Sequence, residues 1–288
     1  MSANRPSSSG GNDVEQTGFF DGQGGPSLFY RFEHDADDRA ALLIAHGLGE
    51  HSGRYRNLVE AVRPRNISVF AVDHRGFGQS GGSRGCVERF GQYVDGVKTL
   101  AEFAASKMGK KKLFLLGHSM GGLIAIHYAL RFPETIAGVI PSSAALQVSV
   151  PIPRIKGALG RLMSGIAPGL TLDNELVPDH LCRDPEVVRD YVNDPLVHRR
   201  ISTRLFTELM TGMDFAHARA AQLRMPLLIF HGTGDKITHP DGSKRFFEAA
   251  GSADKTLKFY EGFYHETMND PGHEQVTKTV ADWIDARI

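Results

Sequence analysis

Ser119 lies in a segment whose residue types could make it a nucleophile. The run GHSMGG, residues 117–122, directly follows an apolar run, and this pattern predicts a strand, a sharp turn and a helix. A serine hydroxyl attacks a carbonyl carbon only when a base removes its proton, and such a turn would present the hydroxyl to a histidine. The glycines two positions before and after the serine have a steric reason, because a Cβ there would clash with neighbouring backbone. A glycine-rich turn capped by serine is the competing interpretation, and the flanking strand and helix disfavour it.

An acid and a histidine later in the chain would complete a catalytic triad. Asp235 and His265 each follow an apolar run that predicts a strand, so both belong to loops at strand ends. Taken alone, Asp235 would favour a structural Asx turn. His118 is the nearest competing histidine, but neighbouring side chains diverge at a sharp turn, and we expect it to point away from the Ser119 hydroxyl. We predict Ser119 as the nucleophile, His265 as the general base and acid, and Asp235 as the carboxylate that orients the imidazole.

The negative oxygen that forms when a hydroxyl attacks a carbonyl needs backbone N–H donors already in place. Met120 directly follows the predicted nucleophile and supplies one N–H. Leu48 stands between two glycines in a loop after another predicted strand, so its backbone can approach closely, and we predict its N–H as the second donor. His46 begins that loop, and we expect it to hold the loop by side-chain hydrogen bonds rather than to act in catalysis.

Alternating strands and helices are expected to position these residues. Apolar, β-branched and aromatic runs predict strands over residues 28–32, 41–45, 67–72, 112–116, 136–140, 227–230 and 257–260, and helical periodicity covers residues 87–108 and 122–132. Such alternation is typical of an α/β fold with a mostly parallel sheet and helices on both faces, and ligands bind at the carboxyl ends of its strands. Residues 17–32, with glycines between two apolar runs, predict a hairpin at the sheet edge.

Residues 145–218 interrupt this alternation, because they contain no convincing central strand. We predict a helical cap there, inserted between two parts of the core at residues 15–144 and 219–288, after a disordered tail at residues 1–14. Large apolar residues recur in the cap at near-helical spacing: Val150, Ile152, Ile155, Leu159, Leu162, Met163 and Ile166. This apolar stripe favours a lid helix that packs on the main domain over a face that docks on a membrane, although a lid over an apolar pocket could do both.

Composition disfavours several classes of function. The 288 residues include 33 Lys plus Arg and 33 Asp plus Glu, so no net charge favours nucleic acid or an anionic membrane surface as a partner. Cys86 and Cys182 lack metal-ligand spacing, which suits a reducing compartment, and a disulfide between them is left open. No cluster of ligand-type residues predicts a metal, and no motif predicts a cofactor. Neither a signal peptide nor a membrane span is predicted, so we expect a cytoplasmic protein whose only membrane contact would be peripheral, through the cap.

Four blocks together resemble the α/β-hydrolase superfamily: HGLGEHSGRY at residues 46–55, DHRGFGQSGG at 73–82, HSMGG at 118–122 and LKFYEGFYH at 257–265. Within that superfamily the chain is similar to the monoacylglycerol lipase family, also called the serine aminopeptidase S33 or lysophospholipase-like group. The first block is much more specific than the serine motif. The resemblance implies an α/β-hydrolase fold with an inserted cap. It also implies hydrolysis of a monoacylglycerol to fatty acid and glycerol, with the acyl chain under the cap.

The resemblance further implies a polar end of the pocket that is built from Glu50, Arg54 and Tyr191. A glycerol leaving group needs donors and acceptors, and a Glu and an Arg four residues apart on one turn could supply both. A surface ion pair is an equally weighted alternative for Glu50 and Arg54. Most of the cap departs from the family, so a broad carboxylesterase, a lysophospholipase or a peptide-cleaving enzyme stays open. A ligand-binding receptor on the same fold, with slow or no turnover, is the alternative from another class.

Overall fold

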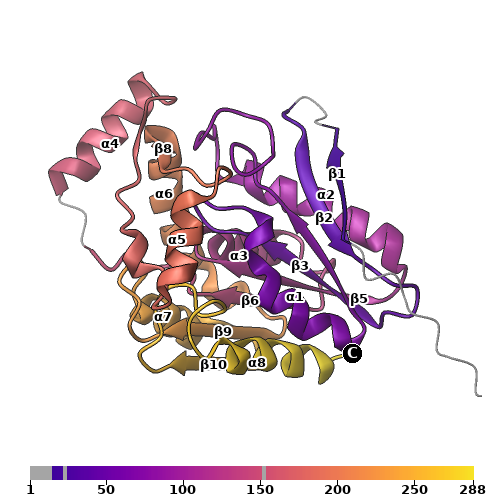
Figure 1. Ribbon diagram of the computed structural model, residues 1–288. Helices are drawn as coiled ribbons and strands as arrows, with labels where there is room; N and C mark the ends of the chain where they lie inside the picture. Colours follow the sequence, from indigo (N-terminus) through magenta and orange to yellow (C-terminus); the bar gives the residue numbers. More distant parts are fainter. Residues whose placement is uncertain (1–14, 22–24, 151–153) are drawn as a thin grey trace, which may run out of the picture.

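A mostly parallel β-sheet forms the centre of the molecule and carries helices on both faces (Figure 1). The computed structural model describes residues 15–21, 25–150 and 154–288. The tail expected at residues 1–14 and Ile152 of the apolar stripe lie outside the described residues. The predicted fold class, a mostly parallel sheet between two helical layers, is confirmed.

The strands of the described residues form two sheets of unequal size. They are β1 (Gln16–Phe20), β2 (Leu28–Glu33), β3 (Ala40–Ala45), β4 (Ile67–Val72), β5 (Lys112–His118), β6 (Gly138–Ser142), β7 (Thr171–Asp173), β8 (Arg200–Ser202), β9 (Leu227–Gly232) and β10 (Lys255–Tyr260). The large sheet has the order β1-β2-β4-β3-β5-β6-β9-β10, and β7 pairs with β8 in the cap. In the large sheet β2 runs antiparallel to β1 and β4, and the remaining neighbours are parallel. The predicted edge hairpin is therefore confirmed as β1 and β2.

Two layers of helices cover the large sheet. The helices are α1 (Arg56–Val62), α2 (Gly91–Met108), α3 (Met120–Arg131), α4 (Arg154–Ile166), α5 (Pro185–Asn193), α6 (Thr203–Arg219), α7 (Pro240–Ala249) and α8 (His273–Asp285). Apolar side chains of α1 and α8 pack on one face, and those of α2, α3, α6 and α7 pack on the other. Strand β3 shows how the sheet separates the two cores. Its alternate residues Ala41, Leu43 and Ala45 join one core, whereas Ala40, Leu42 and Ile44 join the other.

Residues 145–218, which the sequence predicts to form a cap, contribute no strand to the large sheet, and their first helix differs from the expectation. Helix α4 stands at the edge of the molecule, beside α6 and clear of the sheet (Figure 1). It packs on α6 through its small residues, since Gly160 lies against Phe206 and the Ser164 hydroxyl is 3.0 Å from that of Thr207. The apolar stripe faces outward instead: Val150, Ile155, Leu159, Leu162 and Ile166 are all exposed. The interpretation of this stripe as a surface that packs on the main domain is therefore wrong.

Two further expectations concern cysteines and membrane spans. Cys86 is half-buried and Cys182 is buried, and both are free thiols, so the disulfide left open between them does not form. In the described part of the chain, none of the helices combines the length and the apolar character that crossing a bilayer requires.

Candidate functional site

Ser119 sits at a strained turn between β5 and α3, as the motif predicts. Its φ of 55° and ψ of −118° lie outside the regions that non-glycine residues usually adopt. The two flanking glycines make this turn possible. A Cβ on Gly117 would lie 2.0 Å from the carbonyl oxygen of Gly121, and a Cβ on Gly121 would lie 2.0 Å from that of Ala45. The steric reason expected for both glycines is confirmed.

The structure brings Asp235 and His265 together in the loops after β9 and β10. His265 Nδ1 is 2.7 Å from Asp235 Oδ2, and both side chains are almost fully buried. Gly232 lets the two loops approach, because a Cβ there would lie 2.3 Å from the carbonyl oxygen of Phe263. The N–H of Gly234 then donates a 2.9 Å hydrogen bond to that same oxygen. The acid and histidine expected from sequence spacing therefore form one hydrogen-bonded pair.

The charges of this pair shift both groups in the directions that a triad needs. Burial by itself lowers the pKa of His265, but the Asp235 carboxylate outweighs burial and raises that pKa above its ordinary value. Burial raises the pKa of Asp235, yet the charge of His265 and hydrogen bonds from His231 and His265 outweigh it and hold that pKa far below its usual range. These shifts favour an ionised Asp235 beside an imidazole that takes up a proton more readily than a free one.

Backbone donors hold the second oxygen of Asp235. The N–H groups of Ile237 and Thr238 donate to Oδ1 at 2.8 and 3.0 Å. This is the Asx-turn arrangement considered above for the residue. The same aspartate therefore closes its own loop with one oxygen and faces His265 with the other.

His118 lies closer to the site than expected. Its ring packs on that of His265, with 4.7 Å between the ring centroids. It also lines the cavity that contains Ser119, and its Nδ1 lies 3.4 Å from Ser142 Oγ. Burial and the neighbouring His265 lower the pKa of His118 to about 3. His118 therefore accepts a proton less readily than His265 does.

The two predicted oxyanion donors flank Ser119. Leu48 and Ser119 line one cavity, and Met120 is the first residue of α3, so its N–H has no acceptor within the helix. The Leu48 loop is held from both sides. His46 is fully buried, with Nδ1 2.8 Å from Gly47 O and Nε2 2.8 Å from the N–H of His74, which confirms the expected structural role of His46.

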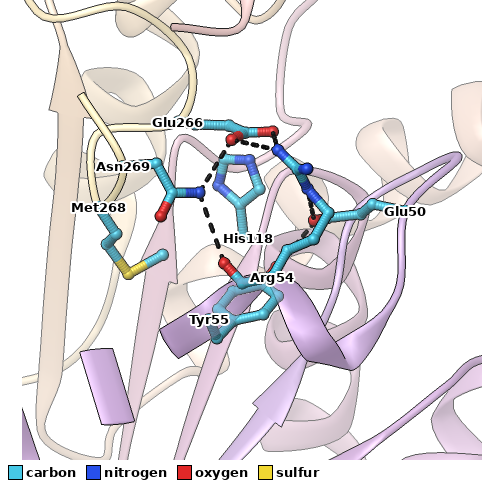
Figure 2. A pocket seen from close by; sticks show the side chains of 7 residues that line it. All are labelled: Glu50, Arg54, Tyr55, His118, Glu266, Met268 and Asn269. Atoms are coloured by element: carbon cyan, nitrogen blue, oxygen red, sulfur yellow. Dashed lines mark hydrogen bonds and ion pairs between the residues drawn. The ribbon is translucent and has the colours of Figure 1, made fainter. Parts of the chain in front are cut away.

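Glu50 and Arg54 belong to a buried charged cluster. Their side chains are 6% and 9% exposed, so the interpretation as a surface ion pair is wrong. Arg54 donates to both oxygens of Glu266, at 2.9 and 2.8 Å, and its Nε lies 3.3 Å from Glu50 Oε2 (Figure 2). The guanidinium carbon of Arg54 lies 4.8 Å from the ring centroid of Tyr191. Because Glu50 and Tyr191 both contact Arg54, the three predicted substrate-binding residues do lie together. Asn269 donates a further hydrogen bond to Glu266, at 2.9 Å.

Besides facing Arg54, Glu50 makes hydrogen bonds to its own segment that the spacing of residues does not predict. Its Oε1 accepts the N–H of Gly47 at 2.6 Å and the hydroxyl of Tyr55 at 2.8 Å. Oxygen Oε1 thus fixes the loop of Leu48, while Oε2 faces Arg54. The charged cluster is therefore connected directly to the loop of Leu48, one of the two predicted oxyanion donors.

Sequence reasoning missed Glu266 and His231 as members of the site. Glu266 directly follows His265, and its pairing with Arg54 joins residues 212 positions apart. Burial raises the pKa of Glu266, but the Arg54 guanidinium outweighs burial and holds that pKa below its ordinary value. His231 lies 3.0 Å from Asp235. Its place four residues before the acid, at the end of a buried strand, is the only signal that could have drawn attention to it.

The cavity at Ser119 is small and lies partly under the cap. Its lining includes Leu176, Leu181 and Tyr191 from the cap, together with Ser119 and His265 from the core. Its volume is about 10 Å³, roughly the room that one water molecule needs. Within the parts of the chain that the structure describes, no group of three His, Cys, Asp or Glu side chains is placed to hold a metal ion.

Comparison with known proteins places this geometry in a family. A model of the family described as serine aminopeptidase, S33 matches residues 36–272. The chain belongs to this family. Among its relatives, a monoacylglycerol lipase of Mycolicibacterium smegmatis is 34% identical over 92% of this chain and 95% of the relative. The phospholipase YtpA of Bacillus subtilis is 32% identical over 86% of this chain and 96% of the relative.

Solved structures of S33 relatives share the fold. The crystal structure of Paleococcus ferrophilus monoacylglycerol lipase matches with a TM-score of 0.84 and 37% identity, over 91% of this chain and 99% of that chain. The predicted α/β-hydrolase fold and the resemblance to the monoacylglycerol lipase family are confirmed. This chain is therefore a hydrolase of the S33 family.

Proposed function

We propose that this protein is a serine hydrolase that cleaves monoacylglycerols to a fatty acid and glycerol. One observation carries the proposal: a serine in a strained turn shares a buried cavity with a histidine that is bound to an ionised aspartate. Two monoacylglycerol lipases support this substrate class: that of Mycolicibacterium smegmatis is 34% identical over 95% of its length, and that of Paleococcus ferrophilus is 37% identical over 99% of its chain.

The mechanism follows from the positions of three side chains. His265 takes the proton of the Ser119 hydroxyl while Oγ attacks the carbonyl carbon of the ester. Asp235 stabilises the imidazolium that forms, without itself taking the proton. The tetrahedral intermediate collapses, the C–O bond to glycerol breaks, and His265 gives its proton to the departing oxygen. A water molecule then attacks the acyl-enzyme by the same route, which releases the fatty acid and restores Ser119.

The negative oxygen of both intermediates is assigned to the N–H groups of Leu48 and Met120. Removal of one such donor in other hydrolases lowers kcat by about 10²- to 10³-fold. The Leu48 loop has a fixed shape, because the Gly47 N–H donates to Glu50 Oε1 and the Gly47 carbonyl lies 2.8 Å from His46 Nδ1, which supports this assignment.

Glu50, Arg54 and Tyr191 are assigned to the glycerol end of the substrate. Glu50 and Tyr191 line the cavity of Ser119, and Arg54 lies directly behind them. The Tyr191 hydroxyl is buried and has no hydrogen-bond partner among the described residues, so a glycerol hydroxyl would satisfy it. Burial also raises the pKa of Tyr191, which keeps the hydroxyl available as a donor.

The substrate reaches this site only if the cap moves. A space for one water molecule does not hold an acyl chain, so Leu176, Leu181 or Tyr191 must shift when a lipid binds. The exposed face of α4 supplies a reason for such a shift at a lipid surface. This helix carries Arg154, Lys156 and Arg161 and no acidic residue. A helix with an exposed apolar face and a net positive charge fits an anionic bilayer, which we assign as the surface on which the cap docks.

Vesicle binding tests the docking face. The double variant L159S/L162S should lose cosedimentation with phosphatidylglycerol vesicles, whereas F259S, a matched loss of an exposed apolar side chain on β10, should not. Equal sedimentation of both variants and the wild type would refute the lipid assignment.

A serine-directed probe and a substrate panel test the activity. A fluorophosphonate should label the wild type and not Ser119→Ala, and labelling that is absent in both or equal in both would refute the serine mechanism. Monoacylglycerols of increasing chain length should be turned over faster than lysophospholipids and short-chain esters. Faster turnover of a lysophospholipid would refute the monoacylglycerol assignment and favour a lysophospholipase.

A further inference from the structure

A second histidine, His231, binds the aspartate of the triad. It is the next-to-last residue of β9 and is completely buried. Its Nε2 lies 3.0 Å from Asp235 Oδ2, the same oxygen that His265 Nδ1 contacts at 2.7 Å. One carboxylate oxygen therefore lies between two imidazoles, and the mechanism above uses only one of them.

The surroundings of His231 determine which of its nitrogens carries the proton. Nε2 faces two groups that only accept hydrogen bonds, the ionised Asp235 Oδ2 at 3.0 Å and the carbonyl oxygen of Thr238 at 3.1 Å. The Thr238 hydroxyl also lies 3.3 Å from Nε2, but its single proton has closer acceptors in Asp235 Oδ2 at 2.9 Å and Ser143 O at 3.0 Å. Nε2 must therefore be the donor. Nδ1 lies 2.8 Å from Oγ of Ser243, a fully buried residue of α7, and in a neutral ring it accepts the hydroxyl proton. Ser243 thus fixes the tautomer in which His231 donates to Asp235.

We propose that His231 is a positioning residue for the hydrolytic reaction, which holds Asp235 Oδ2 in line with His265 through a donated Nε2–H. This inference rests on the proposed function. Oδ1 is already held by two backbone N–H groups. At Oδ2 the Thr238 hydroxyl lies 2.9 Å away, but it also lies 3.0 Å from Ser143 O and has one proton for the two acceptors, so the Nε2–H of His231 completes the restraint of the carboxylate at this oxygen. A carboxylate held at both oxygens cannot rotate away when His265 becomes charged.

Loss of this hydrogen bond has a predictable effect on the base. The positive end of the His231 N–H dipole points at the oxygen that faces His265, so it partly offsets the field of the carboxylate there. Without the dipole, the aspartate acts more strongly on His265 and the pKa of His265 rises further. The acid limb of the kcat/KM profile should then move to higher pH.

Two variants of His231 separate the donor from the bulk of the ring. His231→Gln keeps a donor, since the amide nitrogen of glutamine reaches about as far along the side chain as Nε2. His231→Leu fills similar space without a donor. We expect H231L to lose about 10- to 100-fold in kcat with little change in KM, because a misplacement of about 1 Å costs that much. H231Q should keep kcat within about threefold of the wild type and return the acid limb toward its wild-type position.

His217→Leu is a matched control. His217 Nε2 also bonds a backbone carbonyl, that of Leu146 at 3.0 Å, but it does not contact Asp235. The kcat and the pH profile of H217L should equal those of the wild type. The proposal is overturned if H231L keeps kcat within twofold of the wild type, if H231Q loses as much as H231L, or if the acid limb of H231L does not move.

A measurement on the wild type tests the inference even if H231L does not fold and even if the protein shows no turnover. In ¹⁵N-histidine NMR spectra, the signals that disappear in H231Q should show a proton on Nε2 and none on Nδ1. A proton on Nδ1 would overturn the proposal. Ser243→Ala removes the hydroxyl that bonds His231 Nδ1, and it should lower kcat by a smaller factor than H231L does. A wild type without turnover would refute the proposed function, whereas the tautomer would still decide the role of His231.

Discussion

Arg54 is expected to contribute strongly to stability, because it is the cation between two buried carboxylates. Replacement of Arg54 by Met keeps much of the side chain's volume but leaves Glu50 and Glu266 without their counter-charge. Loss of one partner from a buried ion pair costs about 3–5 kcal/mol. With an unfolding entropy of about 2.1 cal/mol/K per residue over 288 residues, this corresponds to a fall in Tm of about 5–8 °C.

The stability that R54M loses should be larger at high pH than at low pH. In the wild type the pKa of Glu266 is lowered in the folded state, so its contribution to stability is present above the unfolded pKa and is lost only at lower pH, as the pH falls through the folded value. Without Arg54, burial raises that pKa above the unfolded value, and the folded variant takes up a proton as the pH falls. The difference in stability between R54M and the wild type should therefore be largest near pH 8 and smaller near pH 5.

Thermal and urea unfolding at these two pH values measure both effects. Arg56→Met is the matched control, since Arg56 and Glu60 form an exposed pair on the same segment and its loss should leave the unfolding midpoint unchanged within error. The double variant R54M/E266Q should recover part of the stability lost in R54M. A loss below about 1 kcal/mol in R54M, far under the usual cost of a broken buried pair, or a loss that grows as the pH falls, would refute the reasoning.

Three further predictions concern the triad and the turn of the nucleophile. Ser119→Ala should lower ester turnover by at least about 10⁴-fold without unfolding the protein, and a loss of only a few-fold would show that another residue attacks. The acid limb of kcat/KM should have its midpoint above pH 6.5, because the pKa of His265 is raised above that value and the base acts only when neutral; a midpoint below 6.5 would contradict the role of Asp235. Gly121→Ala should lower the free energy of unfolding by about 1–3 kcal/mol, because the added Cβ would clash with the carbonyl oxygen of Ala45. Urea unfolding measures this loss. Gly165→Ala is the control and should not destabilise the protein, because no atom lies within 4 Å of the position of its Cβ.

Features set by neighbouring residues in the chain were predictable from the sequence. The strand before Ser119, its two glycines and the loops that carry Asp235 and His265 follow from local steric and apolar patterns, and the structure contains all of them. Strand β6 was predicted two residues early because Ile136, which precedes it, is apolar and buried as well. Boundaries of this kind depend on pairing with other strands rather than on residue type.

Features set by distant contacts were not predictable. The periodicity of α4 gives the face on which Leu159 and Leu162 lie, but it does not say whether protein or another surface covers that face. Arg54 and Glu266 meet only because the loop after β10 folds over the segment before α1. His231 reads as an ordinary buried strand residue until the turn at Asp235 brings the carboxylate back toward it.

The hydrogen bond from the Gly47 N–H to Glu50 Oε1 lowers the energy that the reaction must spend on reorienting the backbone dipoles of this loop. A flexible loop would have to rearrange its dipoles each time negative charge develops on the substrate oxygen, and that rearrangement would add to the barrier. Here a carboxylate three residues along the chain fixes the loop before any substrate arrives, so the cost of orienting these dipoles is met once, during folding. Stability of the charged cluster and speed of the chemical step are therefore linked, and variants that loosen Glu50 should slow catalysis even when they still bind substrate.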